Sequence, residues 1–278
     1  MEQAGYEERG YLNEDFRLFH LRGAMAESVD WHYHTFHKII LFLSGRAGYG
    51  IEGKSYALEA GDLVLVPSGC IHRPEVAQDA PYERVIVYIS PDFLRSQSTP
   101  EHELESCFAR ARAEFRFVLR PGAERRLLTA TLASLEREQT EAAFGAPILA
   151  QALFFQFFIS VSRGMAEQRL AYVPSTVRDE KIAALLQYLS VHLTEELRID
   201  DLAAQFYISK YHMMRRFKEE TGYTIHNYVV TKRLMLAREK IADGMAVSEA
   251  CYACGFGEYS AFARAYKKLF AVSPRTAK

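Results

Sequence analysis

The sequence predicts an α+β protein of two domains. An N-terminal antiparallel β-barrel with added helices precedes an all-α C-terminal domain with two helix-turn-helix units. The length of 278 residues suffices for two domains. Short apolar runs with glycine and proline turns fill residues 11–90, whereas helical spacing prevails beyond about residue 100. The last third also contains two similar helical segments about 49 residues apart.

The N-terminal strands are indicated by apolar runs that are too short for helices. Turn residues such as Glu59–Asp62 and Pro67–Gly69 separate these runs. Many short strands at close spacing are typical of an antiparallel barrel or jelly roll. The runs are Phe16–Leu21, Ile39–Leu43, Ser55–Leu58, Leu63–Val66 and Glu83–Ile89.

Three helical segments are predicted after the barrel, at residues 101–118, 122–142 and 147–168. Phenylalanines cover nearly all sides of the last one, so it is expected to be buried against the barrel or against a second subunit. Its apolar run, Ile148–Val161, has 14 residues. Because about 20 residues are needed to cross a bilayer, no membrane partner is expected.

A polar, proline-containing stretch at 169–180 breaks the helical pattern. We predict a linker at 171–180 between an N-terminal domain, residues 1–170, and a C-terminal domain, residues 181–278. Residues 180–278 carry a net charge of +4 and the remaining residues −5, although the whole chain carries −1. This asymmetry points to a nucleic-acid module beside an acidic domain.

The four cysteines are too few for a disulfide scaffold, and the N-terminus has no apolar signal core. We therefore expect a cytoplasmic protein with reduced thiols. Cys251 and Cys254 form a C-x-x-C pair, a pattern found in redox and zinc sites. Without a second pair or a βαβ context, buried structural cysteines are the better interpretation.

The first of the two similar segments predicts a helix at 210–220 with one buried and one exposed stripe. Ser209 is expected to be its N-cap, because a serine hydroxyl can accept from an amide at the helix start. Met213 and Phe217 lie four residues apart and should face the core. The opposite stripe can contact guanine and phosphate in a major groove. Its members are Tyr211, Met214, Arg215 and Lys218.

The second segment repeats this design, with Phe262 and Tyr266 as its buried stripe. A helix at about 225–243 separates the two segments and spans about 28 Å. Two reading helices about 34 Å apart, one DNA turn, are therefore feasible. The alternative is an ordinary solvated face, which the duplicated spacing disfavours. The exposed residues are Tyr259, Ser260, Ala263, Arg264 and Lys267.

Specific motifs accompany these stripes. S-x-x-x-M-x-R-x-F-K-x-E-x-G begins at Ser209, R-L-x-x-A at Arg233 and G-F at Gly255, before a final S-P. Over about residues 181–275 the chain thus resembles the DNA-binding domain of the AraC/XylS family of transcription regulators. Ala250 and Cys251 depart from the larger aliphatic residue and alanine usual there. The resemblance implies base contacts by Lys210, Tyr211, Met214, Arg215, Tyr259, Ser260, Ala263 and Arg264.

Histidines in the strand region form a second candidate site. Three imidazoles that converge inside a small barrel can bind a first-row metal, although hydrogen-bonded barrel histidines are the alternative. The stretch from Gly61 to His72 matches the second cupin motif, G-x5-P-x-G-x2-H, and His32 and His34 match the H-x-H of the first. The N-terminal domain thus resembles a cupin.

Lys38 stands where the first cupin motif has a glutamate, and its charge would repel a metal. We therefore expect neither a metal nor another cofactor. The resemblance to AraC/XylS regulators implies a small effector in the barrel instead, by default a sugar. The candidate effector-binding residues are His32, His34, His72, Arg17, Lys38 and Tyr88.

Together these features predict a sequence-specific DNA-binding transcription regulator, an activator controlled by a small-molecule effector, and not an enzyme. The expected partners are promoter or operator DNA, the effector, RNA polymerase if the protein is an activator, and a second copy of the chain. The resemblance implies that the helices at 122–168 form the dimer contact, and burial within the monomer is the alternative. Two alternatives stay open. One is a metal-dependent cupin enzyme with an appended DNA-binding module. The other is a ligand-independent regulator controlled by a protein partner, which a polar, filled barrel would favour.

Overall fold

The computed structural model describes residues 12–23, 29–77, 81–141 and 143–276. These residues form two compact units, and the division falls between Thr176 and Val177. The division lies within the segment 171–180, where a linker is expected. Residues 1–11, at the start of the expected N-terminal domain, lie outside the described part of the chain.

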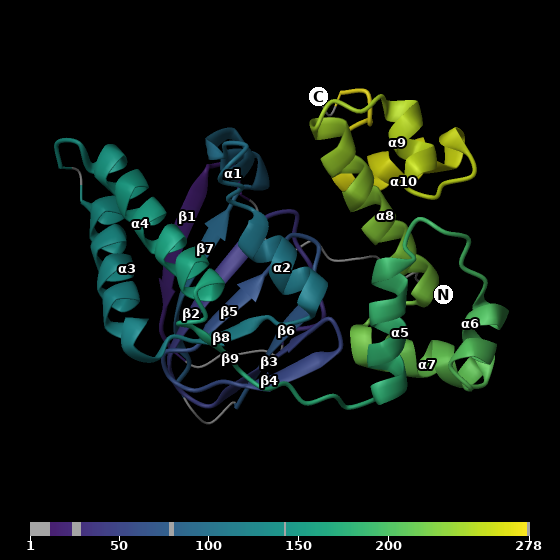
Figure 1. Ribbon diagram of the computed structural model, residues 1–278, viewed down its shortest axis with the longest axis horizontal. Helices are drawn as coiled ribbons and strands as arrows, with labels where there is room; N and C mark the ends of the chain where they lie inside the picture. Colours follow the sequence, from purple (N-terminus) through teal and green to yellow (C-terminus); the bar gives the residue numbers. More distant parts are fainter. Residues whose placement is uncertain (1–11, 24–28, 78–80, 142, 277–278) are drawn as a thin grey trace. The chain divides into compact units, whose positions relative to one another are not determined.

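The first unit contains two sheets (Figure 1), with strand orders β1-β7-β2-β5-β8-β9 and β4-β3-β6. All named pairings are antiparallel. The predicted sheet-rich antiparallel domain is confirmed, but the described pairings form two separate sheets rather than one closed barrel. The strands are β1 (Phe16–Leu21), β2 (His37–Ser44), β3 (Ala47–Ile51), β4 (Lys54–Ala57), β5 (Leu63–Val66), β6 (His72–Val76), β7 (Glu83–Ile89), β8 (Val118–Arg120) and β9 (Ala171–Tyr172).

The two faces of β2 are buried in different cores. Ile39 packs with the helices in one hydrophobic cluster, whereas Ile40 packs with residues of the smaller sheet in another. Because strand side chains alternate between faces, Lys38 shares the face of Ile40. Strand pairing sets Lys38 opposite Tyr88 of β7. An ionisable side chain is thereby carried into the interior between the sheets.

Helices cover the other face of the larger sheet, where α3 and α4 lie side by side along β1 (Figure 1). Phe154, Phe157 and Phe158 of α4 are fully buried in the first unit. The segment 101–118, expected to be one helix, instead holds α2 and the start of β8. The helices are α1 (Pro91–Gln97), α2 (Ser106–Glu114), the 3-10 helix η1 (Gly122–Glu124), α3 (Arg125–Thr140) and α4 (Ala146–Ala166).

By length and composition alone, the 21-residue helix α4 could cross a membrane. The expectation that this segment is too short is therefore wrong. Its aromatic residues nevertheless pack in the same core as Val161, Met165 and the larger sheet. Burial inside the protein therefore accounts for the phenylalanines on one side of α4, whereas Ile148 and Leu149 near its start are exposed.

The described part of the second unit consists of helices. The pairs α6–α7 and α9–α10 form the two helix-turn-helix units, and α8 lies between them in the chain. Cys251 and Cys254 are free and buried, as expected, in the core that α8, α9 and α10 share. The helices are α5 (Glu180–Val191), α6 (Ile199–Gln205), α7 (Lys210–Thr221), α8 (Ile225–Ala242), α9 (Val247–Ala253) and α10 (Tyr259–Phe270).

Arg233 of α8 connects the loop ahead of the first helix-turn-helix unit to the turn inside the second. Its guanidinium donates to the carbonyl oxygens of Leu193 at 2.7 Å and Glu195 at 2.5 Å, in the loop between α5 and α6. It also donates to the carbonyl oxygen of Gly255 at 2.7 Å, in the turn between α9 and α10. Gly255 has a φ of +81°, and a Cβ there would lie 2.5 Å from the carbonyl oxygen of Thr194. Glycine is therefore required at this junction.

Candidate functional site

The expected exposed stripe of the first reading helix lies on the surface of α7. Met213 and Phe217 are fully buried, as the spacing predicts, so the other side of the helix faces solvent. Ser209 occupies the N-cap position, but its side chain makes no capping hydrogen bond, so that part of the prediction is wrong. Met214 is half-buried, and the exposed residues are Lys210, Tyr211, Arg215 and Lys218.

Helix α10 has the same division between core and solvent. Phe262 and Tyr266 are fully buried. Half-buried Tyr259 lies beside the first of them, with ring centroids 6.1 Å apart, and Ala263 is also half-buried. The remaining predicted contact residues are exposed, namely Ser260, Arg264 and Lys267.

The cations of the two faces differ in their surroundings. Lys210 pairs with Asp200 at 2.8 Å and Arg215 with Glu219 at 3.7 Å, but exposed ion pairs of this kind are worth little and are easily exchanged for phosphate. Within the described residues, Lys218, Arg264 and Lys267 have no ion pair. Both faces can therefore offer their cations to DNA.

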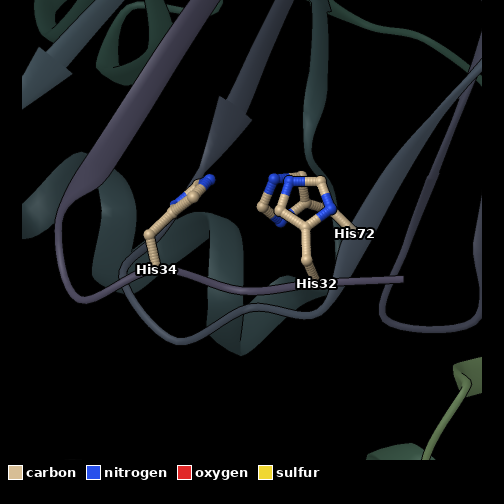
Figure 2. Close-up of side chains that lie close together, drawn as sticks. All are labelled: His32, His34 and His72. Carbon is tan, nitrogen blue, oxygen red and sulfur yellow. The ribbon is translucent and has the colours of Figure 1, made fainter. Parts of the chain in front are cut away.

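The three predicted histidines meet in the first unit, although two of them lie about 40 residues before the third (Figure 2). Backbone hydrogen bonds join His32 and His72 as an antiparallel bridge, at 3.1 and 2.9 Å. The ring centroid of His72 lies 4.3 Å from that of His32 and 4.5 Å from that of His34. All three side chains are buried.

Hydrogen bonds orient two of these rings. Nδ1 of His32 lies 2.8 Å from the carbonyl oxygen of Asp30, and Nδ1 of His72 lies 2.9 Å from that of Cys70. A carbonyl only accepts, so Nδ1 donates in each ring. In His72, whose pKa is held low, Nε2 then carries the lone pair. Neither ring nitrogen of His34 makes a hydrogen bond of regular geometry among the described residues, although the backbone of Phe36 partly offsets the lowering of its pKa.

Lys38 completes this group, which we call the histidine cluster: His32, His34, His72 and Lys38. Its Nζ lies 3.3 Å from Nε2 of His72 and 5.5 Å from the centre of the Tyr88 ring. Burial, helped by the positive charge of Arg84, lowers the pKa of Lys38 to about 7. Burial and then the charge of Lys38 hold the pKa values of His34 and His72 well below their usual range. The cluster is therefore adapted to neutral nitrogen groups.

Arg17 is not brought into the cluster. Strand pairing places it opposite Tyr88, but at the sheet edge its side chain is 54% exposed and pairs with Glu14 at 2.7 Å. Two aromatic neighbours were missed by sequence reasoning. The Phe36 ring stacks on His34 with centroids 4.4 Å apart, and the Tyr49 ring on His72 at 5.8 Å. Alternation along a strand could have indicated Tyr49, but not which histidine it contacts.

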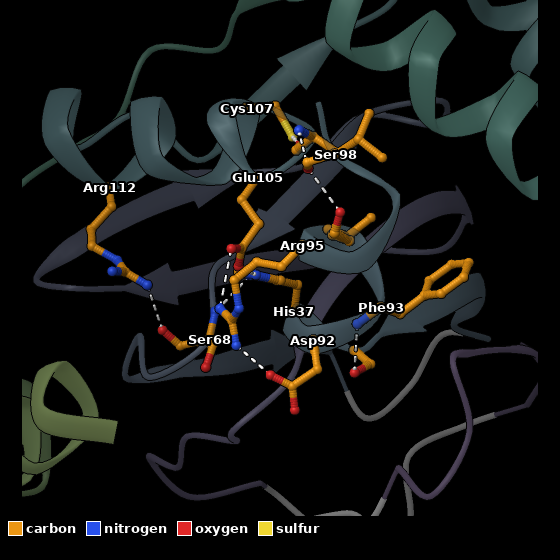
Figure 3. A network of polar contacts seen from close by, with 12 residues as sticks. His37, Ser68, Asp92, Phe93, Arg95, Ser98, Glu105, Cys107 and Arg112 are labelled. Carbon is orange, nitrogen blue, oxygen red and sulfur yellow. Dashed lines mark hydrogen bonds and ion pairs between the residues drawn. The ribbon is translucent and has the colours of Figure 1, made fainter. Parts of the chain in front are cut away.

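A polar network connects the turn before His72 to helices α1 and α2 (Figure 3). Nδ1 of His37 accepts from the Ser68 amide at 3.0 Å, and Nε2 of the same ring donates to Glu105 at 2.9 Å. Glu105 in turn accepts from Arg95 at 3.2 Å, and Arg112 donates to the Ser68 carbonyl at 2.9 Å. A change at the histidine cluster can therefore reach both helices through the turn at residues 67–70.

Comparisons with known proteins match both units. Residues 18–158 match the family described as AraC-like ligand binding domain, and residues 202–278 match the family described as helix-turn-helix domain. The chain is 26% identical to the HTH-type transcriptional activator RhaS of Klebsiella pneumoniae (strain 342) over 251 residues, 88% of this chain and 85% of that protein. It is also 26% identical to RhaS of Escherichia coli (strain K12 / DH10B) over 250 residues, with the same coverage.

A solved structure of wild-type ToxT from Vibrio cholerae strain SCE256 with bound unsaturated fatty acid aligns over 96% of this chain and 95% of ToxT. The identity is 14% and the TM-score 0.38.

Proposed function

Because the chain belongs to the AraC family of DNA-binding transcription activators, we propose that α7 and α10 read operator DNA under the control of an effector bound at the histidine cluster. The relatives are transcriptional regulators and not enzymes, so no catalytic role is assigned. We place the protein in the cytoplasm, where operator DNA and RNA polymerase would be its partners. A sugar effector stays a prediction.

The observation that carries the proposal is the duplicated design of α7 and α10. Each helix buries two large side chains on one side and presents an arginine, a lysine and an aromatic ring on or near the other. Arginine pairs bidentately with guanine in the major groove, whereas lysine contacts phosphate. Two such helices in one chain can read two successive groove segments.

The effector can control DNA binding only if it binds two arrangements of the protein with different affinity. The network from Ser68 through His37 to Glu105 gives the histidine cluster a route to α1 and α2. Helix α4 supports a proposed homodimer, because Ile148 and Leu149 near its start are exposed apolar residues. If so, the molar mass in solution measured by light scattering is that of two chains, and Ile148→Glu lowers it.

The proposal is tested with operator duplexes selected by the full chain from a random library. Arg215→Ala should weaken binding by about 1–3 kcal/mol and relax the preference at one base position, as measured by fluorescence anisotropy. Arg216→Ala is the matched control, because Arg216 lies on the same helix but pairs with Asp179 at 3.0 Å, so base preference should not change. Equal loss on every duplex would show that Arg215 only contacts phosphate.

A further inference from the structure

The turn between α6 and α7 (Figure 1) holds a bulky residue in a conformation that favours glycine. Tyr207 has a φ of +52°. Its amide donates to the carbonyl oxygen of Ala204 at 3.2 Å, and the amide of Ile208 donates to that of Ala203 at 3.1 Å. This pair of bonds closes many helix C-termini, and the residue at the left-handed position is usually glycine. Because a Cβ in that conformation crowds the next carbonyl oxygen, the tyrosine costs folding free energy.

The second helix-turn-helix unit builds the same turn with glycine. At the end of α9, the amide of Gly255 donates to the carbonyl oxygen of Tyr252 at 3.0 Å, and the amide of Phe256 donates to that of Cys251 at 3.2 Å. Tyr207 thus occupies in the first unit the position that Gly255 holds in the second. The turn itself needs no side chain there, so the role of the tyrosine ring lies outside the turn.

Packing does not explain the tyrosine either. Its neighbours Phe206 and Ile208 are half-buried, and the Phe206 ring lies edge-on to that of Tyr188 in α5, with centroids 5.7 Å apart. Tyr207 itself is 88% exposed. Backbone strain that brings no gain in packing is typical of residues with a functional contact. The exposed ring is therefore a candidate for binding a partner.

Cations lie next to this turn. Nζ of Lys181, an exposed residue in the first turn of α5, donates to the carbonyl oxygen of Tyr207 at 2.7 Å. An ammonium group has three donors, so two are left for a ligand. Lys210 follows at the start of α7 and pairs with Asp200 at 2.8 Å, which neutralises that carboxylate. The turn therefore suits an anionic partner that offers several acceptor oxygens.

The position of the turn favours a phosphate of the DNA backbone as this partner. A reading helix enters the major groove with its N-terminal residues, so the turn directly before it meets the sugar–phosphate backbone beside the groove. Tyrosine and lysine side chains are common donors to phosphate oxygens. The net charge of +4 on residues 180–278 favours the same partner.

We propose that Tyr207 and Lys181 bind the operator backbone beside the groove segment that α7 reads. The phenol hydroxyl and the ammonium group donate to phosphate oxygens, and the ring packs against deoxyribose. Contacts of this kind add affinity without base preference. The inference rests on the proposed function, because it takes α7 as a reading helix. It assigns the first unit a backbone contact that Gly255 cannot supply in the second.

The test uses the full chain and duplexes that it selects from a random library, with binding measured by fluorescence anisotropy. Tyr207→Gly should lower the affinity about 10-fold on selected and scrambled duplexes alike, because a hydrogen bond to a charged group is lost. The same variant should slow hydrogen exchange of amides in α6 and α7 about 2–5-fold, because it relieves the backbone. Tyr207→Phe keeps the ring and should lose less affinity than Tyr207→Gly. Lys181→Met should reduce the slope of log affinity against log salt concentration by about 1.

Ala271→Gly is the matched control. Ala271 follows α10 in the same unit and has a φ of +60°, but its replacement removes no ring. The variant should slow exchange in α10 and leave the affinity for DNA unchanged. Equal affinity of Tyr207→Gly and the wild type would overturn the inference. A loss confined to one base position would overturn it as well, because the ring would then read a base.

The two proposals fail in different ways. A wild type that selects no duplex removes the proposed function and this inference with it. A wild type that selects operator duplexes, together with a Tyr207→Gly variant that binds them equally well, removes only the backbone contact. Loss of transcription activation in Tyr207→Gly at unchanged DNA affinity does the same, since the ring would then contact a protein.

Discussion

The buried Lys38 should make the stability of the first unit strongly dependent on pH. Its pKa falls from an ordinary 10.5 to about 7, mainly through burial. Between these values the unfolded chain binds a proton that the folded chain does not, so stability rises with pH. At 1.36 kcal/mol per pKa unit, burial of Lys38 costs about 4 kcal/mol at pH 7 and about 2 kcal/mol at pH 9.

Lys38→Met removes this titration and keeps an unbranched side chain of similar length. We expect the variant to be more stable than the wild type by several kcal/mol at pH 7, and this advantage to shrink by about 2 kcal/mol at pH 9. Urea unfolding, followed by Trp31 fluorescence, reports this unit alone because no other tryptophan exists. Lys54→Met, in β4 and half-exposed, is the control and should show no comparable change with pH. An advantage of equal size at both pH values would refute the reasoning.

Two further predictions concern the stability of the first unit and use the same urea assay. Phe158→Ala should destabilise it by about 3–5 kcal/mol, because the ring is fully buried. Ile148→Ala, on the exposed side of α4, should cost under about 0.5 kcal/mol. Similar costs for the two variants would contradict the assigned burial. Arg120→Ala should cost about 2–3 kcal/mol, because it leaves the buried carboxylate of Asp62 without its two hydrogen bonds from Arg120 at 2.8 and 2.9 Å. The cost stays below that of breaking a fully buried pair, because Arg120 itself is 39% exposed. Glu59→Ala removes only the exposed partner of Arg120 and should cost under about 1 kcal/mol, so an equal loss in both variants would count against a special role of Asp62.

Local patterns predicted the elements in which one face is buried. The alternation in Glu83–Ile89 and the spacing of Met213 with Phe217 correspond to β7 and α7. Strand β6 was missed because Pro74 and charged residues interrupt its pattern, although pairing with β3 stabilises it. Tertiary pairing, not local propensity, forms such a strand.

Local patterns also predicted the candidate effector site only in part, because tertiary pairing forms it. Its histidines were identified by motif, but their convergence depends on the backbone bridge between His32 and His72, which no local pattern encodes. Arg17 was also expected at the site, whereas at the sheet edge its side chain faces water. Lys38 was recognised as the residue that replaces the cupin glutamate, but only the structure reveals that its Nζ lies 3.3 Å from Nε2 of His72.

The guanidinium of Arg233 makes the two DNA-reading modules mechanically dependent on each other. The loop between α5 and α6 and the turn between α9 and α10 both accept hydrogen bonds from this one side chain. Neither helix-turn-helix unit can change its orientation alone without breaking these hydrogen bonds, so both units should bind DNA as one rigid body. Substitutions on the exposed sides of α7 and α10 could then change which bases are recognised, while the spacing between the two helices stays constant.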